Sequence, residues 1–176
     1  MDYVKTRTNK ANNYFHYGKN QHINMKKLQC IIHSPSPNTA LIQEETTKIL
    51  LKETSNLIIS VKSPFDTDAD DILNSDGVLI GTTENLSSMA GATKDFFDRT
   101  YYSLLEKKEG LPAAIWIRAG HDGTGTLKQF NSILKGLKWK LIQEILVCQG
   151  NWNEKFIDQC TELSLSLAIG LEENIF

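Results

Sequence analysis

From residue 26 onward, short apolar runs alternate with longer segments in which apolar residues recur at helical spacing. Uninterrupted apolar runs are typical of strands that are buried on both faces of a sheet. Such runs predict five strands, at residues 28–32, 57–61, 78–80, 113–117 and 139–146. The segments between and after them predict helices over residues 39–53, 68–74, 89–105 and 127–136, and a last helix after Asn153.

Several predicted helix ends carry residues with a known capping preference. Thr67 precedes the acidic segment 68–74, and Asn153 precedes the last helix, so both are predicted to be N-caps. Gly136 follows the fourth helical segment, and glycine often closes a helix in the left-handed conformation.

Strands that alternate with helices predict βαβ units, and therefore a parallel sheet with helices on both faces. In such a sheet the ligand binds outside the carboxyl ends of the strands. The loops that follow the first, third and fourth predicted strands are therefore the places where we expect chemistry.

The loop after the first strand runs from His33 to Ala40 and leads directly into a helix. A helix N-terminus offers unpaired backbone N–H groups and a partial positive charge, which together favour a phosphate. Further polar groups come from Ser34, Ser36, Asn38 and Thr39. The loop has neither the G-x-G-x-x-G pattern of dinucleotide-binding domains nor the G-x-x-x-x-G-K-[ST] pattern of P-loop NTPases. Phosphate binding and an ordinary strand-to-helix turn both stay open at this point.

The loop after the third strand spans Gly81 to Gly91 and is mostly polar. Its backbone could run along the edge of a flat heterocycle, where Asn85 could both donate to and accept from a pyrimidine-like ring. The alternative is a polar surface loop.

The loop after the fourth strand covers residues 119–126 and contains Gly120, Gly123 and Gly125. Glycine permits positive φ and a close approach of the backbone to a ligand. His121 lies among these glycines and could contact a cofactor or donate a proton. The alternative is a solvated histidine without a chemical role.

Length, charge and cysteine content narrow the function classes. The 176 residues suit one domain, and the net charge of −2 argues against a nucleic-acid partner. No apolar run approaches the roughly 20 residues that span a bilayer, and no apolar stretch follows the basic residues near the N-terminus, so we expect neither a membrane span nor a secretory signal. Cys30, Cys148 and Cys160 are odd in number and widely spaced, which predicts reduced thiols in a cytoplasmic protein and no metal site.

Residues 1–25 differ in character from the rest of the chain. They are rich in Asn and Lys and show no hydrophobic period, which predicts a poorly ordered extension before a domain over residues 26–176. Three aromatic residues, Tyr14, Phe15 and Tyr17, are the exception and could dock on a surface or on a second subunit.

Together, three blocks of sequence resemble the flavodoxin-like FMN proteins, and within them the branch of NADPH-dependent FMN reductases and NAD(P)H:quinone reductases. The blocks are residues 33–39 (HSPSPNT), residues 81–85 (GTTEN) with 89–91 (MAG) and 94–100 (KDFFDRT), and residues 118–125 (RAGHDGTG). The resemblance covers residues 26–176. It implies a three-layer α/β sandwich whose five-stranded parallel sheet has the order 2-1-3-4-5 and carries helices on both faces.

The same resemblance implies a cofactor site. The FMN phosphate would lie on the first loop, at Ser34, Ser36, Asn38, Thr39 and Ala40. The flavin would contact the second loop, at Thr82, Thr83, Glu84, Asn85, Leu86 and Ser87. Three residues of the third loop would flank its pyrimidine side, namely Gly120, His121 and Gly123. Pro37 stands where the family commonly has glycine, and its ring removes one backbone N–H.

The function implied by this resemblance is that of an oxidoreductase that passes electrons from NAD(P)H through FMN to a quinone or flavin acceptor. FMN supplies the redox chemistry, so no side chain needs to act as a nucleophile, and His121 is the one candidate for a catalytic role. The resemblance also implies a homodimer. Two alternatives stay open: an electron-carrier flavodoxin, and a degenerate interaction protein that no longer binds flavin, which the altered second loop suggests.

Overall fold

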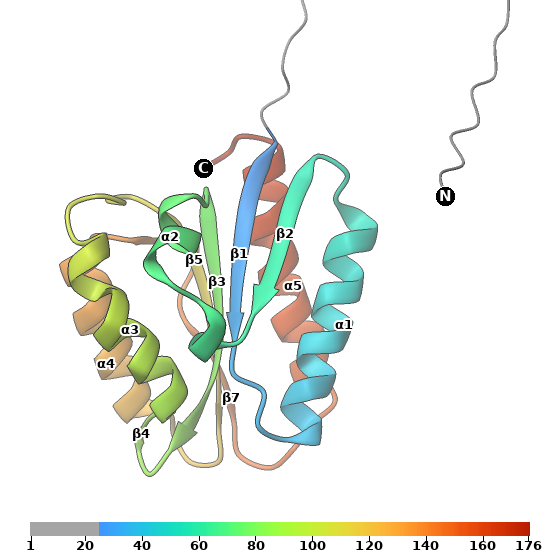
Figure 1. Cartoon of the computed structure of the whole chain (residues 1–176). Coiled ribbons are helices and arrows are strands. Elements are labelled where there is room, and N and C mark those ends of the chain that lie inside the picture. Colours follow the sequence, from blue (N-terminus) through green and yellow to red (C-terminus); the bar gives the residue numbers. More distant parts are fainter. Residues whose placement is uncertain (1–24) are drawn as a thin grey trace, which may run out of the picture.

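The computed structural model describes residues 25–176, which form a sheet covered by helices on both faces (Figure 1). The strands are β1 (Lys26–Ile32), β2 (Leu57–Lys62), β3 (Gly77–Asn85), β4 (Ser88–Met89), β5 (Pro112–Ala119), β6 (Lys140–Leu141) and β7 (Leu146–Gln149). The helices are α1 (Pro37–Glu53), α2 (Ala69–Leu73), α3 (Gly91–Leu104), α4 (Thr124–Leu137) and α5 (Lys155–Glu172), with a 3-10 turn η1 (Pro64–Asp66).

The order of the strands confirms the predicted topology. Within the described residues the sheet runs β2-β1-β3-β5-β6, and β7 also pairs with β5. Short β6 pairs with the start of β5 and β7 with its end, so the two together fill the fifth position. All of these pairs are parallel, which gives the flavodoxin-like order 2-1-3-4-5.

Apolar side chains on the two faces of the sheet form two separate cores. One core joins the sheet to α3 and α4 and includes Ile80, Phe96 and Phe130. The other joins the sheet to α1 and α5 and includes Leu79 and Trp116. Successive strand residues point to opposite faces, so the neighbours Leu79 and Ile80 enter different cores. This double burial explains why the strands have uninterrupted apolar sequences.

The third strand is longer than predicted. Residues 81–85 were expected to be loop but continue β3 to Asn85, which then pairs with Ser88 of β4 in an antiparallel hairpin. The physical reason is pairing with the neighbouring strand, because β5 extends far enough to match Thr82 with Ile117 and Thr83 with Arg118. Backbone pairing here outweighs the polar character of the side chains.

The prediction of a single strand over residues 139–146 is also wrong, in the middle of that range. Residues 142–145 leave the sheet, and the pairing resumes at Leu146 and continues to Gln149. Gln143 and Glu144 in this interruption are exposed to solvent. Two adjacent polar residues therefore mark the break between β6 and β7.

Two predicted helix caps lie elsewhere. Asp68, not Thr67, is the N-cap of α2, where its side chain and that of Asp71 each accept a backbone N–H from the other residue. Gly136 lies inside α4, which ends at Leu137 and is followed by Lys138 as a C-cap in the left-handed conformation. A Cβ at Gly136 would lie 1.9 Å from the hydroxyl of Tyr101, so this glycine serves the close packing of α3 on α4.

The starts of several helices differ from the prediction by one to three residues, and α1 and α4 begin earlier than predicted, at Pro37 and Thr124. Asn153 accepts a hydrogen bond from the backbone N–H of Lys155 at 3.0 Å, but the N-cap position of α5 is Glu154. Helix α3 starts at Gly91 rather than Met89, because Met89 belongs to the β3–β4 hairpin.

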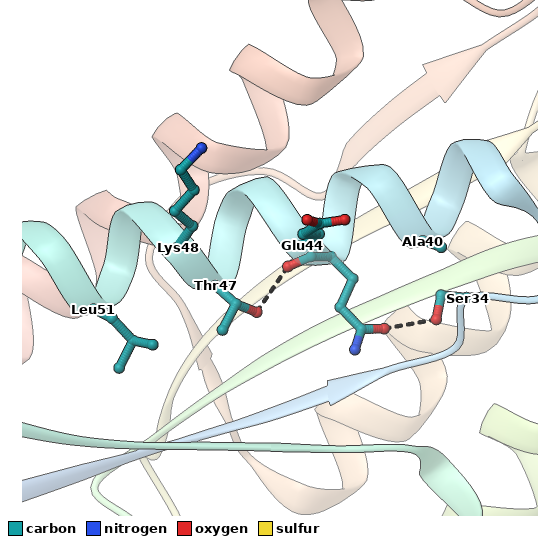
Figure 2. Close-up of a pocket in the computed structure, with 7 residues that line it drawn as sticks. Ser34, Ala40, Glu44, Thr47, Lys48 and Leu51 are labelled. Atoms are coloured by element: carbon teal, nitrogen blue, oxygen red, sulfur yellow. Dashed lines mark hydrogen bonds between the residues drawn. The ribbon is translucent and has the colours of Figure 1, made fainter.

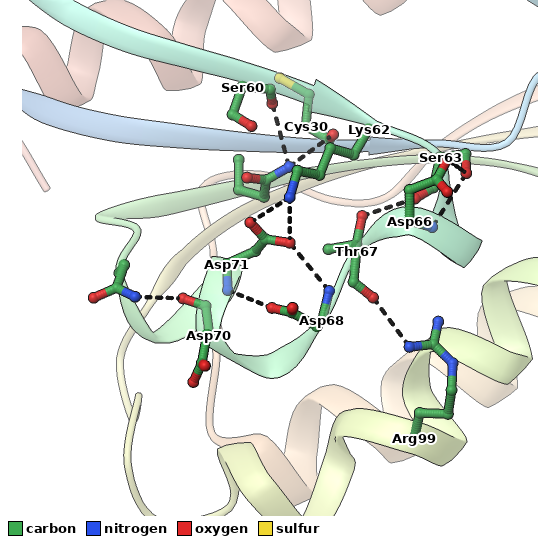
Figure 3. Close-up of polar contacts among 12 residues, drawn as sticks. Cys30, Ser60, Lys62, Ser63, Asp66, Thr67, Asp68, Asp70, Asp71 and Arg99 are labelled. Carbon is green, nitrogen blue, oxygen red and sulfur yellow. Dashed lines mark hydrogen bonds and ion pairs between the residues drawn. The ribbon is translucent and has the colours of Figure 1, made fainter.

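The connection from β2 to α2 is fixed by polar contacts (Figure 3). The Lys62 ammonium lies 2.7 Å from a carboxylate oxygen of Asp71. From α3, the Arg99 guanidinium donates to the carbonyl oxygens of Thr67 at 3.1 Å and Pro64 at 2.8 Å. These contacts hold η1 and α2 against α3.

The predicted N-terminal extension lies outside the described residues except for Met25. Over residues 25–176, no helix is both long enough and apolar enough to cross a membrane. The same part of the chain contains no group of three or more His, Cys, Asp or Glu side chains that could hold a metal ion.

Candidate functional site

The loops after β1, β3 and β5 lie at one edge of the sheet, the lower edge in Figure 1. The chain leaves β1 toward α1 on one face and leaves β3 toward α3 on the opposite face. The switch point of the topology therefore lies between these neighbouring strands, and this is where open α/β sheets bind ligands. The structure brings the three predicted loops to that edge.

The first loop turns into α1 through a reciprocal cap. Ser36 is the N-cap, and its hydroxyl accepts the backbone N–H of Thr39 at 3.3 Å. In return, the Thr39 hydroxyl accepts the backbone N–H of Ser36 at 3.1 Å, and the two hydroxyl oxygens lie 3.0 Å apart. Pro37 fills the first helical position, where a missing N–H costs nothing within the helix. The loop therefore forms a regular helix start without any charged group.

Other predicted phosphate ligands lie around this cap. Asn38 and Ala40 are exposed in the first turn of α1, and Thr39 is buried. The Ser34 hydroxyl donates to the side-chain oxygen of Gln43 at 2.6 Å. The first turn of α1 contains no acidic residue, so the positive end of the helix dipole is not neutralised from within its own turn.

A cavity of about 460 Å³ lies along α1 beside this loop (Figure 2). It is lined by Ser34, Ala40, Gln43, Glu44, Thr47, Lys48 and Leu51. Two predicted phosphate-loop residues, Ser34 and Ala40, thus meet in it, but its lining includes no residue of the loops after β3 or β5. The cavity covers only the α1 side of the predicted site.

The second loop is a tight hairpin rather than an open loop. Its two turn residues, Leu86 and Ser87, have φ of 51° and 58°, and the Leu86 side chain is fully exposed at the tip. Positive φ at both positions is the geometry of a type I′ hairpin turn, which favours Asn and Gly. Leucine in this conformation is therefore an unusual and strained choice.

The two neighbouring threonines of β3 point to opposite faces of the sheet. The Thr82 hydroxyl lies 2.7 Å from that of Thr93 on α3, so Thr82 is used inside the fold. Thr83 lies on the same face of the sheet as Gly81. The Trp116 ring packs on Gly81 and belongs to the core with α1 and α5, so Thr83 also faces those helices. The Thr83 hydroxyl is buried and has no hydrogen-bond partner among the described residues. An unpartnered buried hydroxyl at the carboxyl end of a strand is what a ligand contact would satisfy.

Glu84, predicted to contact flavin, links the second loop to the third. Its carboxylate accepts the backbone N–H of Gly123 at 3.1 Å and that of Thr126 at 3.2 Å, together with the Thr126 hydroxyl at 3.0 Å. Gln129 adds two further contacts from α4 to the hairpin, at the backbone N–H of Met89 and the hydroxyl of Ser88. The hairpin is therefore fixed on the first turns of α4.

Contact between the hairpin and α4 is also close at the backbone. A Cβ built on Gly125 would lie 1.8 Å from the carbonyl oxygen of Ser87. Only glycine permits this approach. The predicted role of Gly123 in backbone geometry is consistent with its φ of 75° at the N-cap of α4.

Gly120, His121 and Asp122 are exposed just before this helix start. The Asp122 carboxylate accepts the backbone N–H of Thr124 at 3.1 Å, and this hydrogen bond lowers the pKa of Asp122. On the first loop, partial burial lowers the pKa of His33. Asn85 remains exposed on the hairpin, so its amide can reach a ligand from solvent.

Arg118 is a residue of this edge for which the sequence suggested no role. Its guanidinium donates to the carbonyl oxygens of Ala119, Cys148 and Gly150, the last two at 3.0 and 2.6 Å, and lies 5.3 Å from the ring centre of Phe156. It joins the ends of β5 and β7 to α5. A lone cation at the end of an apolar strand is the signal that could have identified it.

The fit of the predicted cofactor differs between its two parts. The α1 N-terminus, with its hydroxyl side chains and no acidic residue, fits a phosphate. The buried Thr83 hydroxyl supplies an unsatisfied polar atom on the same face of the sheet. For the ring, the exposed groups are Asn85, Gly120 and His121, since Thr82 and Glu84 are engaged within the protein.

Comparison with known proteins identifies the fold of the chain but not its family. No protein-family model matches the sequence, and no curated protein does. Among solved structures, an archaeal flavodoxin has a TM-score of 0.68 at 17% identity, over 82% of this chain and 98% of its own. Flavodoxin 1 from Bacillus cereus has a TM-score of 0.68 at 16% identity, with the same 82% and 98% coverage.

An oxidoreductase from Corynebacterium diphtheriae has a TM-score of 0.61 at 17% identity, over 85% of this chain and 98% of its own. Identities this low show the fold alone. The chain therefore has the flavodoxin-like fold, with its candidate site at the edge where that fold switches topology.

Proposed function

We propose that the protein binds FMN at the carboxyl edge of its sheet and acts as a flavin-dependent electron-transfer protein. One observation carries the proposal: the uncharged, hydroxyl-rich N-terminus of α1 lies at the topological switch point, on the same sheet face as the unpaired Thr83 hydroxyl. The flavodoxins among the structural neighbours support it.

The phosphate would be held by dipoles rather than by cations. No Lys or Arg occurs among residues 33–40, so the binding groups are the hydroxyls of Ser34, Ser36 and Thr39 and the free backbone N–H of Asn38 at the start of α1. The Ser36 hydroxyl can rotate to donate to an anion while it still accepts the Thr39 backbone N–H, whereas the Thr39 hydroxyl would first give up its hydrogen bond to the Ser36 carbonyl oxygen, 3.0 Å away. A helix N-terminus of this kind binds phosphate without a neighbouring charge.

FMN, when bound, supplies the reversible uptake of electrons. The role of the chain is to bind and orient the cofactor. The exposed Asn85 amide can donate and accept at the edge of the ring system, and the His121 imidazole can hold or donate a proton on the side of the third loop.

The first test compares FMN with riboflavin, which lacks the phosphate, by titration with visible absorbance and flavin fluorescence. FMN is expected to bind at least about tenfold more tightly than riboflavin, a difference of about 1.4 kcal/mol. Equal affinities would show that the phosphate does not bind at α1, and absence of binding by both flavins would overturn the proposal.

Variants of two threonines in the same helix locate the phosphate. Thr39→Val should weaken FMN binding but leave riboflavin unaffected, because it removes a hydroxyl of the α1 cap at the end where only the phosphate binds. The matched control is Thr46→Val, since Thr46 is also buried in α1 but bonds to Thr161 on α5. A bulky apolar residue at position 39 should also weaken FMN binding more than a replacement of Tyr101. The reverse order would mean that the phosphate binds elsewhere.

The finer proposal is that electrons come from NAD(P)H and go to a quinone or flavin acceptor. Mixing the FMN-loaded protein with NADPH or NADH without oxygen tests it by the loss of flavin absorbance. Fast bleaching followed by reoxidation with a quinone supports the reductase. Reduction by dithionite but by neither nicotinamide would favour an electron-carrier flavodoxin.

A second candidate function is that of an interaction protein without flavin. The contacts of Glu84 and Gly125 favour it, because they close the hairpin onto α4 where the ring would meet the second and third loops. Absence of FMN binding by a folded wild-type protein is the result that would select this function.

We further propose a cytoplasmic homodimer. Tyr102 is exposed on α3, with its ring 5.5 Å from that of Tyr101, and offers an apolar contact for a second copy. Sedimentation of the wild type and of Tyr102→Glu tests this: a dimer that the substitution dissociates supports the proposal, and a wild-type monomer contradicts it.

A further inference from the structure

Two cysteines face each other in the core between β7 and α5. The Sγ atoms of Cys148 and Cys160 lie 3.6 Å apart, and both side chains are fully buried. Cys30 on β1 is also buried, but no sulfur partner for it occurs among the described residues. The spacing of Cys148 and Cys160 contains no C-x-x-C pattern, so the sequence alone did not pair them.

The distance suits a disulfide after a small movement. A disulfide has an S–S length of about 2.05 Å, so the two sulfurs must approach by roughly 1.5 Å. Both residues lie on regular elements that already pack together, β7 and α5.

The two thiols are chemically unequal. The hydrogen bond from Cys160 lowers the pKa of Cys148, and the nearby Arg118 guanidinium acts in the same direction. The hydrogen bond to Cys148 raises the pKa of Cys160, and burial adds to the effect. Cys148 is therefore the sulfur that loses its proton more readily and attacks first, because the thiolate is the nucleophile.

We propose that Cys148 and Cys160 are a site of reversible disulfide formation, oxidised by a low-molecular-weight disulfide such as oxidised glutathione. The Cys148 thiolate attacks one glutathione sulfur and releases a glutathione thiolate. The Cys160 sulfur then attacks Cys148 in this mixed disulfide and releases the second glutathione. Two protein thiols are oxidised, one glutathione disulfide is reduced to two thiols, and both protons end on glutathione.

Access to the buried sulfurs comes from the start of α5. The N-cap Glu154 makes no side-chain cap hydrogen bond, and Lys155 is exposed. Cys160 is only five residues beyond Lys155. Opening of the first turn and a half of the helix exposes it once the hydrogen bond from Lys155 to Asn153 and the contact of Phe156 with Arg118 are broken. Helix ends open locally at much lower free energy than the whole domain.

The experiment uses the full chain without added flavin, so its outcome does not depend on FMN binding. After incubation with oxidised glutathione, free thiols are blocked and the protein is digested with trypsin. Cleavage after Lys155 separates the two cysteines into peptides 141–155 and 156–176. The expected product is these two peptides joined by a disulfide, with Cys30 blocked as a free thiol and the disulfide reversed by reduced glutathione.

Single variants provide the controls. Cys30→Ala should form the same disulfide as the wild type, whereas Cys160→Ala should yield at most a glutathione adduct on Cys148. A wild-type digest with three free thiols, with a disulfide to Cys30, or with glutathione adducts alone would overturn the proposal. The wild-type digest decides the question even if a variant does not fold.

Discussion

Two helices, α1 and α4, start at the carboxyl edge of the sheet, and the side chains at their N-termini differ in charge. The start of α1 is closed by the hydroxyls of Ser36 and Thr39 and has no acidic residue in its first turn. The start of α4 receives two carboxylates, Glu84 from the hairpin and Asp122 from its own loop. Both helix dipoles attract anions, but only the dipole of α4 is neutralised by the protein itself.

This difference in charge indicates where an external anion can bind. A phosphate at α4 would have to compete with a carboxylate held by three hydrogen bonds. At α1 it meets only neutral groups. The resemblance to FMN proteins implies cofactor contacts in both loops, and the structure places carboxylates at the start of α4 but not at the start of α1.

The largest expected effect comes from making α1 resemble α4. Ser36→Asp keeps a good N-cap but adds a negative charge where the phosphate would bind. FMN affinity should fall by roughly 100-fold, about 2.7 kcal/mol, because two negative charges then meet within a few ångströms.

The control for this change is Ser36→Asn, which caps the helix without a charge. It should retain most of the FMN affinity, and both variants should melt close to the wild type. Equal losses in the two variants would show that helix geometry, not charge, decides binding at α1.

The next largest effect concerns the contact that closes the hairpin on α4. Gly125→Ala places a Cβ against the Ser87 carbonyl and should lower the free energy of unfolding by about 2 kcal/mol, since backbone must move. Urea denaturation measures it. Gly91→Ala is the control, because a Cβ there meets nothing within 4 Å. Similar stabilities of the two variants would contradict the close contact.

A smaller effect follows from removing the charge of Glu84. Glu84→Gln keeps the size of the side chain but weakens its hydrogen bonds to α4 and its interaction with the helix dipole. We expect a loss of about 1 kcal/mol in the free energy of unfolding. Glu162→Gln, at an exposed position of α5, should change stability little. If the two variants are equally stable, the carboxylate of Glu84 does not neutralise α4.

The smallest effect is a pH dependence at the α1 loop. Burial lowers the pKa of His33 from its ordinary value of 6.5, so the unfolded chain binds a proton more readily than the folded one. Stability should therefore decrease as the pH falls through 6.5 and stop decreasing below the folded pKa. Chemical denaturation between pH 7.5 and 5 measures it, and His33→Gln should reduce the slope.

The sequence predicted the alternation of strands and helices because each core-forming run is locally apolar. It did not predict the end of β3, since residues 81–85 carry no apolar side chain and are held in the sheet by pairing with β5 and then β4. Nor did it predict the hairpin turn, because Leu86 and Ser87 lack the Asn-Gly signal of a type I′ turn. Loop geometry that depends on a neighbouring strand leaves no trace in local periodicity.

The candidate site shows the same limit. The cap at Ser36 and Thr39 could be recognised because its partners are three residues apart. The role of Glu84 could not, because its partners lie about 40 residues further along the chain. A cap between residues three positions apart can be predicted from the sequence, whereas contacts between loops cannot be predicted without the fold.

The close packing of Ser87 on Gly125 has a consequence for the rate of ligand binding. A flat ring that passes between the hairpin and α4 has to wait until these two segments separate. At low ligand concentration the observed association rate would rise in proportion to concentration, and at high concentration it would level off at the opening rate of the hairpin. The opening rate of the hairpin would then be the maximum rate of ligand binding, whatever the ligand concentration.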